Sequence, residues 1–280
     1  MREQQQSIIR ALRVQPEIEP ASELAVRIAF MQDYLRATHA AGFVLGISGG
    51  QDSTLVGRLA QLAVEGVREE GLDARFVAVR LPHGVQQDED DAQLALSFIQ
   101  PDEVVTVNIQ GAVAGLEAAL EAGIPGLELS DFNRGNVKAR MRMLAQYAIA
   151  GERKMLVLGT DQAAEAVTGF YTKYGDGGTD LNPIAGLTKE QGREILRELN
   201  APERLWQKAP TADLLDTKPG RLDEDELGLR YQDIDAYLTG YDVPEDVARK
   251  IESIYSRSSH KRHMPVLPTD TWWRVQAADE

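Results

Sequence analysis

The stretch "FVLGISGGQDSTLVGRLAQLAVEG" (43–66) constrains the fold more than any other part of the chain. It opens with a short apolar run, turns through glycines, and continues with Leu55, Leu59 and Leu62 at helical spacing. A strand, a glycine turn and a helix amino terminus in this order present unpaired backbone N–H groups to an anion. The stretch therefore predicts one strand–helix unit of an α/β fold, with an anion-binding loop at 46–53.

Three further apolar runs predict the other strands of the same sheet, at 76–81, 103–109 and 155–160. Helical patterns lie between and after them, near 88–99, in the alanine-rich segment that follows the third strand, and at 136–151. Strands that alternate with helices of this length indicate a parallel sheet covered on both faces. We therefore expect an α/β fold with a doubly wound parallel sheet flanked by helices.

Outside the strand region, helical patterns occupy 1–40, 223–239 and 244–257. No internal repeat or low-complexity linker divides the chain. We therefore expect one domain over residues 1–280, a length that can bury a substantial core. A long, charged, proline-bearing stretch predicts a mobile lid near 205–226.

The composition excludes several classes of function. The net charge of −14 disfavours a sequence-independent nucleic-acid binder, which needs a basic face, although a local basic pocket for a small anion is compatible with it. The absence of cysteine removes disulfides, thiolate zinc sites and cysteine nucleophiles. The amino terminus lacks the apolar core of a signal peptide, and no apolar run approaches the roughly 20 residues that span a bilayer. We expect a cytoplasmic protein with no nucleic-acid or membrane partner.

The loop at 46–53 departs from a P-loop because an aspartate stands where a P-loop carries its lysine. Gly49 and Gly50 let the backbone approach a phosphate, and the hydroxyls of Ser48 and Ser53 add donors. An aspartate beside phosphate is tolerable when it holds a divalent cation, so Asp52 is a candidate ligand of Mg²⁺ bound with a nucleotide. The alternative is a plain strand-to-helix turn that Asp52 caps. The complete strand–loop–helix context favours the functional interpretation.

The loop sequence "SGGQDS" resembles the pyrophosphate-binding loop of the adenine-nucleotide α-hydrolase superfamily, whose members cleave ATP between the α and β phosphates. Other stretches resemble the ammonia-dependent NAD⁺ synthetases of that superfamily, over roughly residues 1–275. They are "AVRLPHGVQQDEDDA" (78–92), "DFNRGNVKARMRM" (131–143), "LGTDQAAEAVTGFYTKYGDGGTDLNPI" (158–184), "LTKEQGRE" (187–194), "APTADL" (209–214) and "SHKR" (259–262). The chain departs from the family pattern at Gln162, where histidine is frequent, and at Ser259, where glutamate is usual. Neither departure falls on a position assigned to chemistry.

The resemblance implies the ATP-dependent amidation of deamido-NAD⁺ with ammonia. The nicotinate carboxylate attacks the α phosphate of ATP, which gives an NAD-adenylate and pyrophosphate, and ammonia then displaces AMP. The implied cofactor is Mg²⁺, with ATP as co-substrate. A glutamine-using version needs an amidohydrolase domain with a catalytic cysteine, which this chain lacks. Free ammonia is therefore the expected nitrogen donor unless a separate glutaminase associates.

The resemblance also implies the site residues. It implies Asp52, Glu165 and Lys173 for catalysis, with Asp52 and Glu165 as the Mg²⁺ ligands. The implied ATP contacts are Gly46, Ile47, Ser48, Gly49, Gly50, Gln51, Asp52, Ser53, Arg80, Thr160, Lys189 and Thr211. The implied deamido-NAD⁺ contacts are Arg140, Lys173, Asp180, His260 and Lys261. Without the resemblance, the lysines, Asp180 and His260 would be interpreted as surface charges, Glu165 as an exposed helix charge and Thr160 as a helix cap.

The two arginines of the 136–151 helix are expected to differ. Arg140 flanks the predicted buried face, so it is suited to contact a ligand from the domain edge, whereas Arg142 points roughly opposite and is expected to be solvated. The predicted buried face consists of Val137, Met141, Leu144, Ala145 and Ala148. The family forms homodimers with deamido-NAD⁺ bound across the interface, so we expect a homodimer that shares the first helices and residues 131–150.

Two other functions stay open at this point. The chain could be another ATP-pyrophosphatase that amidates or thiolates a different acceptor, although the lack of cysteine disfavours thiolation and the acidity disfavours a tRNA substrate. It could also be a nucleotide sensor without turnover. The pair Asp52 and Glu165 argues against a sensor, because a sensor needs no metal-activated leaving group.

Overall fold

The computed structural model describes residues 1–84, 89–208 and 222–274. Its sheet has four parallel strands in the order β3-β2-β1-β4. The strands are β1 (Gly42–Gly46), β2 (Arg75–Arg80), β3 (Glu103–Thr106) and β4 (Leu156–Val157). All four predicted strands are therefore confirmed. The last two are shorter than predicted: β3 ends at Thr106, and β4 covers two residues, although the Leu158 N–H still donates to the Val44 carbonyl of β1 at 2.9 Å.

The predicted helices are also present, with breaks between residues 12 and 20 and between residues 227 and 231 that the sequence interpretation did not place. They are α1 (Glu3–Leu12), α2 (Pro20–Thr38), α3 (Gln51–Glu69), α4 (Glu89–Ile99), α5 (Gln110–Gly123), α6 (Asp131–Arg153), α7 (Ala163–Thr168), α8 (Lys189–Glu198), α9 (Glu203–Gln207), α10 (Asp223–Leu227), α11 (Tyr231–Leu238), α12 (Glu245–Arg257) and the short 3₁₀ helix η1 (Ser259–Lys261).

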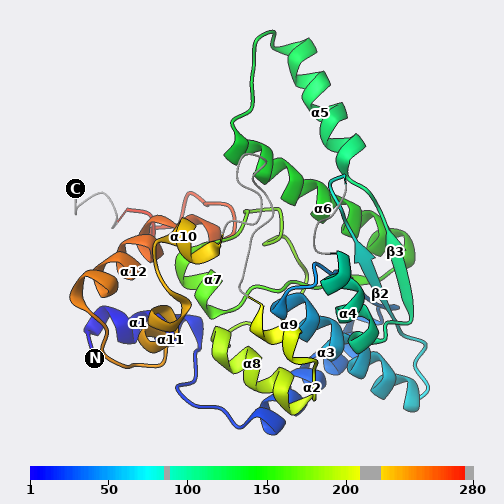
Figure 1. Ribbon diagram of the computed structural model, residues 1–280, viewed down its shortest axis with the longest axis horizontal. Helices are drawn as coiled ribbons and strands as arrows, with labels where there is room; N and C mark the ends of the chain where they lie inside the picture. Colours follow the sequence, from blue (N-terminus) through cyan, green and yellow to red (C-terminus); the bar gives the residue numbers. More distant parts are fainter. Residues whose placement is uncertain (85–88, 209–221, 275–280) are drawn as a thin grey trace.

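Helices cover both faces of the sheet, as the alternation of strands and helices predicts (Figure 1). Successive strand side chains point to opposite faces. Phe43, Leu45 and Phe76 therefore pack into a core with α2, α3, α4 and α8. Val44 and Val77 point the other way, into a core with α5 and α6. This arrangement confirms the doubly wound architecture.

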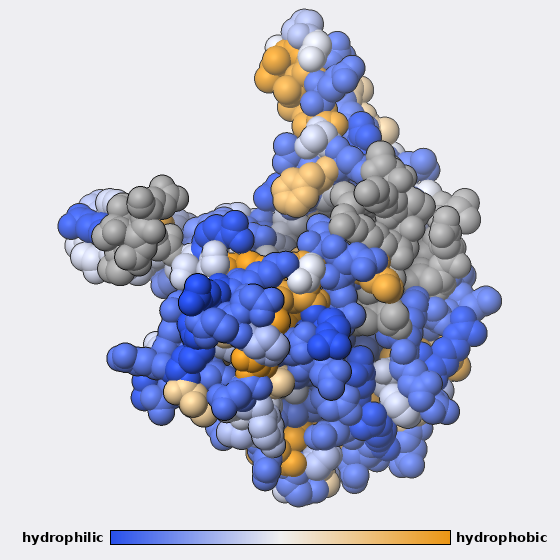
Figure 2. Space-filling model, turned by 60° about the vertical axis from the view of Figure 1, so that its left-hand side comes forward, coloured by the Kyte–Doolittle hydropathy of each residue, from blue (hydrophilic) through white to orange (hydrophobic). Residues whose placement is uncertain are grey.

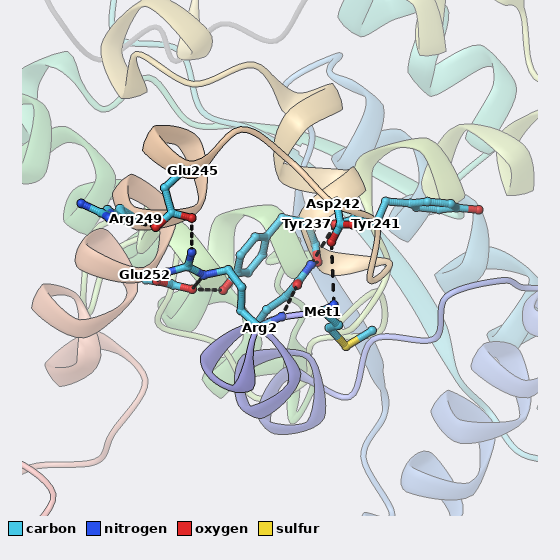
Figure 3. A network of polar contacts seen from close by, with 9 residues as sticks. Met1, Arg2, Tyr237, Tyr241, Asp242, Glu245, Arg249 and Glu252 are labelled. Atoms are coloured by element: carbon cyan, nitrogen blue, oxygen red, sulfur yellow. Dashed lines mark hydrogen bonds and ion pairs between the residues drawn. The ribbon is translucent and has the colours of Figure 1, made fainter.

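A separate core joins the two ends of the sequence, where α1, α7, α11 and α12 pack together beside the sheet (Figure 1). Polar contacts reinforce this packing, as Figure 3 shows. The Arg2 guanidinium donates to both carboxylate oxygens of the buried Glu252, at 2.7 and 2.9 Å, and also pairs with Glu245. The Tyr237 hydroxyl donates to the same Glu252 at 3.2 Å. The start of α1 thus holds α11 and α12 in position. Helix α12 in turn leads into η1.

Helix α6 is rotated from its predicted orientation. Val137, Met141 and Ala145 pack on the sheet as expected, but Leu144 is 57% exposed and Ala148 is exposed as well. The sheet contact follows the i, i+4 series 137, 141, 145, and residues 144 and 148 lie one position off that line. The prediction that Leu144 and Ala148 are buried is therefore wrong for the single chain.

Candidate active site

A cleft of about 440 Å³ opens at the carboxyl ends of the strands. Its walls come from the loop after β1, the segment after β2, the segment after β4 and one face of α6. Ligands of open α/β sheets bind at this edge, where the loops that follow neighbouring strands meet. The cleft therefore lies where the fold predicts the nucleotide site.

The glycine loop has a backbone that only glycine accommodates at one position. Gly49 has a φ of +85°, and a Cβ there would lie 2.7 Å from the backbone nitrogen of Ala92. Gly50 is the N-cap of α3, and among the described residues no side chain caps that helix end. The amino end of α3 thus faces the cleft with N–H groups available to an anion.

Asp52 lies within the first turn of α3, so the alternative that it caps this helix is wrong. Its Oδ2 atom pairs with the Nζ atom of Lys189 at 2.6 Å, although the two residues are 137 positions apart. Lys189 is the first residue of α8, and its side chain is only 4% exposed. The lysine that a P-loop would carry is absent from this loop, and Lys189 of α8, far along the chain, places an ammonium beside it. Lys189 begins a helix as expected but is not a surface lysine.

Several groups hold Lys189 in place. The side-chain amide of Gln51 donates to its carbonyl at 2.8 Å, and the Asp235 carboxylate accepts its N–H at 3.2 Å and that of Glu190 at 2.9 Å. Its ammonium also lies 5.2 Å from the ring centre of Tyr231. Burial alone would lower the pKa of Lys189, but Asp52 and then Glu165 outweigh burial and raise it. The lysine therefore stays charged inside the cleft.

Replacing Asp235 with asparagine should change how stability depends on pH. Burial raises the pKa of Asp235 from 3.8 to about 6. The stability that this raised pKa brings is present below pH 3.8 and is lost as the pH rises through about 6. Between pH 5 and pH 7 the wild-type chain should lose about 1 kcal/mol of unfolding free energy relative to Asp235→Asn. Urea unfolding at both pH values measures this difference, and a constant difference would contradict the raised pKa.

Glu165 projects from α7 into the same cleft. Burial, followed by repulsion from Asp52, raises the pKa of Glu165 well above its ordinary value. Two carboxylates that repel each other in a cleft are the oxygen donors that Mg²⁺ prefers, together with phosphate. No group of three or more acidic or histidine side chains forms a metal cage within the described part of the chain. The residues present therefore fit a cation that the phosphates of a ligand help to hold.

Two further acidic residues beside the site were missed in the sequence. Burial, then Asp176 and Asp52, raises the pKa of Asp161 to about 7. Loss of hydration within the cleft also raises the pKa of Asp176, an exposed residue that lines it. Asp161 directly follows the end of the fourth predicted strand and Asp176 lies in "YGDGG", and these positions were the available signals. These carboxylates repel Asp52 and Glu165, so a cation bound nearby with a ligand would be stabilised.

Basic residues gather at the other side, around Lys261. The Lys261 ammonium lines the cleft and donates to the carbonyls of Gly169 at 2.7 Å and Tyr171 at 2.6 Å. Arg140 donates to the carbonyl of Lys173 at 3.2 Å, and the Lys173 ammonium donates to the carbonyl of His260 at 2.5 Å. Burial and the nearby Lys173 and Lys261 lower the pKa of His260. The structure thus brings four of the five expected deamido-NAD⁺ contacts together, as a local basic region in an acidic protein.

Of this basic region only Lys261 lines the cleft, and two further expected contacts, Asp180 and Arg80, lie outside the lining. Asp180 accepts the Val157 N–H at 2.8 Å and the Tyr147 hydroxyl at 3.1 Å, so it joins β4 to α6 and does not line the cleft. Arg80 is buried at the end of β2 and pairs with Glu89 at 3.0 Å, also outside the cleft lining. Thr211 lies outside the described residues. The remaining loop residues line the cleft except Gly49, which packs beneath it.

Arg142, Thr160 and Gln162 correct the sequence interpretation. Arg142 lines the cleft and donates to the carbonyl of Leu81 at 3.0 Å, so its description as a solvated arginine is wrong. Thr160 lines the cleft, but the cap of α7 is Gln162. The Gln162 side chain accepts the Ala164 N–H at 2.6 Å, and the backbone N–H of Gln162 donates to the Glu165 carboxylate at 3.4 Å. This departure from the family pattern therefore supports the helix that carries Glu165.

Several known proteins are similar to this chain over most of its length. The family model described as NAD synthase matches residues 23–265. The chain is 60% identical to the NH3-dependent NAD⁺ synthetase of Bacillus licheniformis over 270 residues, which is 96% of this chain and 99% of that protein. A crystal structure of NAD⁺ synthetase from Burkholderia pseudomallei is 46% identical, with a TM-score of 0.79 over 93% of this chain and 96% of that one. The structure of NMN synthetase from Francisella tularensis is 32% identical, also with a TM-score of 0.79, over 91% of this chain and 100% of that one.

Proposed function

The chain belongs to the NAD synthase family, and on that premise we propose that it amidates deamido-NAD⁺ to NAD⁺ with ammonia and ATP. It is a ligase of NAD biosynthesis. The observation that carries the proposal is the contact between Asp52 and Lys189, at 2.6 Å, in a cleft at the amino end of α3. A paired aspartate and lysine beside uncapped N–H groups suits ATP cleavage that releases a metal-bound pyrophosphate.

Asp52 and Glu165 are the residues that would hold Mg²⁺. Bound there with ATP, the cation would neutralise charge on the phosphates and make pyrophosphate a better leaving group. The raised pKa of Glu165 supports this assignment. A buried carboxylate that another carboxylate repels is stabilised in its charged form by a neighbouring cation. The magnesium site is part of the proposal.

The first step needs the acceptor carboxylate in line with the bond between the α and β phosphates. The N–H groups of α3 and the Lys189 ammonium would bind the departing pyrophosphate, and their positions are fixed before reaction. The basic region of Arg140, Lys173, His260 and Lys261 would hold the anionic dinucleotide at the opposite side. The carboxylate oxygen then bonds to the α phosphorus, and the bond to pyrophosphate breaks.

The second step is attack of ammonia on the activated carbonyl. The nitrogen lone pair bonds to the carbonyl carbon, AMP leaves with the anhydride oxygen, and one proton leaves the nitrogen. The mixed anhydride must be shielded from water during this step. The 209–221 part of the predicted lid lies outside the described residues, so the lid stays a prediction.

The test is a product assay with MgATP, ammonium and one acceptor at a time. We expect NAD⁺ and AMP in equal amounts from deamido-NAD⁺, and a lower kcat/KM for the mononucleotide analogue. The resemblance to an NMN synthetase makes that comparison necessary, although its identity of 32% is well below the 60% of the NAD⁺ synthetase relative. Formation of AMP with another acceptor only, or a preference for the mononucleotide, would refute the proposal.

A homodimer is a further part of the proposal. Exposed apolar side chains support it, on α6 at Phe132 and Leu144 and on α2 at Val26 and Phe30. Helix α5 and the segment after it project from the body of the molecule and carry apolar surface (Figures 1 and 2).

The structure contains no helix that is both long and apolar enough for a membrane span within the residues it describes. The cytoplasmic location stays a prediction.

A further inference from the structure

A second lysine faces the cleft beside the phosphate loop. Lys208 follows α9, and its side chain, 25% exposed, lines the cleft. Its Nζ atom lies 2.8 Å from the Oδ2 atom of Asp91 in α4. The Asp91 side chain is only 9% exposed, so this carboxylate is fixed in position.

The same turn of α4 also supports the glycine loop. A Cβ at Gly49 would lie 2.7 Å from the backbone nitrogen of Ala92 and 2.9 Å from the carbonyl carbon of Asp91. The backbone of Asp91, whose side chain pairs with Lys208, therefore contacts the glycine loop that leads into the amino end of α3. Asp91 thus places a flexible ammonium next to the predicted phosphate site.

The phosphates of bound ATP would be stabilised by a further cation in this cleft, such as the Lys208 ammonium. Of the other cations that line the cleft, Lys189 pairs with Asp52 at 2.6 Å, Lys261 donates to two backbone carbonyls, and Arg142 donates to the carbonyl of Leu81. ATP brings several negative charges to a cleft already lined by Asp52 and Glu165. An ammonium has three donors, so the contact with Asp91 is compatible with donation from Lys208 to phosphate oxygens of a bound ligand.

We propose that Lys208 binds the terminal phosphates of ATP and the pyrophosphate that leaves, and that Asp91 positions it. The inference rests on the proposed function for the identity of the ligand. Arg204 shares the Asp91 carboxylate at 2.5 Å, but its side chain is 65% exposed and does not line the cleft. Arg204 therefore provides a matched control for the loss of one cation beside Asp91.

The experiment compares Lys208→Met, Lys208→Arg, Asp91→Asn and Arg204→Gln with the wild type. Calorimetry measures the binding of magnesium pyrophosphate and of MgATP in the absence of any acceptor, and steady-state assays measure inhibition by pyrophosphate. Lys208→Met should weaken pyrophosphate binding by about tenfold or more, since a hydrogen bond to a charged group is lost. Lys208→Arg should recover part of that loss, Asp91→Asn should give an intermediate loss, and Arg204→Gln should stay near the wild type.

Two results would overturn the inference. One is unchanged pyrophosphate binding in Lys208→Met. The other is an equal loss in Arg204→Gln, which would show a general effect of charge near Asp91. The binding arm contains no acceptor, so it separates this inference from the proposed function. A wild type that makes no NAD⁺, with weakened pyrophosphate binding in Lys208→Met, would refute the proposed function and leave Lys208 as a phosphate contact. Thermal unfolding of each variant shows whether the fold is retained.

Discussion

Replacing Asp52 with asparagine should abolish NAD⁺ formation while the fold is retained. The substitution keeps the size of the side chain but removes the charge that pairs with Lys189 and that would hold Mg²⁺ with Glu165. We expect kcat/KM for ATP to fall by about 1,000-fold or more, because charge stabilisation by a bound metal is worth several kcal/mol. The measurement is the rate of AMP release over a range of MgATP concentrations.

The control for this variant is Asp246→Asn, which removes a carboxylate from the exposed face of α12. It should keep wild-type activity and thermal unfolding, whereas Asp52→Asn should unfold at a lower temperature but still in one transition, because it leaves the buried Lys189 ammonium without its partner. Activity of Asp52→Asn within about tenfold of the wild type would contradict a metal-binding role, given the size of metal effects.

Replacing Lys189 with methionine should have the second largest effect. The ammonium is buried against Asp52 and Tyr231, and methionine preserves the apolar stem while it removes the charge. We expect kcat/KM for ATP to fall by about 100-fold or more, the scale seen when a preorganised charge-stabilising donor is lost. The affinity for pyrophosphate should fall as well, whereas binding of deamido-NAD⁺ should change little. Product assays and calorimetry measure these three quantities.

The variant should also lose stability, because removal of one partner leaves the Asp52 carboxylate without its buried cation. Lys250→Met is the control, since Lys250 is exposed on α12 and does not line the cleft. A Lys189→Met enzyme with unchanged affinity for ATP would show that Lys189 only balances the charge of Asp52.

The sequence was sufficient to predict what depends on local pattern. The apolar run before Gly46, the glycines after it and the leucines of α3 fixed a strand, a turn and a helix within one continuous stretch. The alternation of such units then implied the parallel sheet, and the position of the loop at its carboxyl edge followed from the topology. The structure confirms each of these predictions.

The partners of the charged groups could not be predicted in the same way. Lys189 and Asp52 meet across 137 residues, and no local pattern encodes that contact. Asp161 and Asp176 occupy turns whose composition is typical of solvated loops, and only the tertiary fold creates the surroundings that raise their pKa values. The resemblance to a family supplied Lys189 as an ATP contact, but not its ion pair.

The two arginines of α6 show a limit of helical periodicity. Arg140 and Arg142 are two positions apart, so a small error in the predicted buried face reverses which of them reaches the cleft. The structure places Arg142 in the lining, whereas Arg140 does not line the cleft and donates to the carbonyl of Lys173. The sequence pattern identified the helix but not its rotation about its own axis.

The central claim is that the acceptor carboxylate attacks the α phosphate of ATP. Deamido-NAD⁺ labelled with ¹⁸O in its carboxylate tests it most directly, by mass spectrometry of the products formed with MgATP and ammonium. The account predicts AMP that carries one ¹⁸O atom, together with pyrophosphate that carries none. Unlabelled AMP, or ADP with the label in inorganic phosphate, would contradict it.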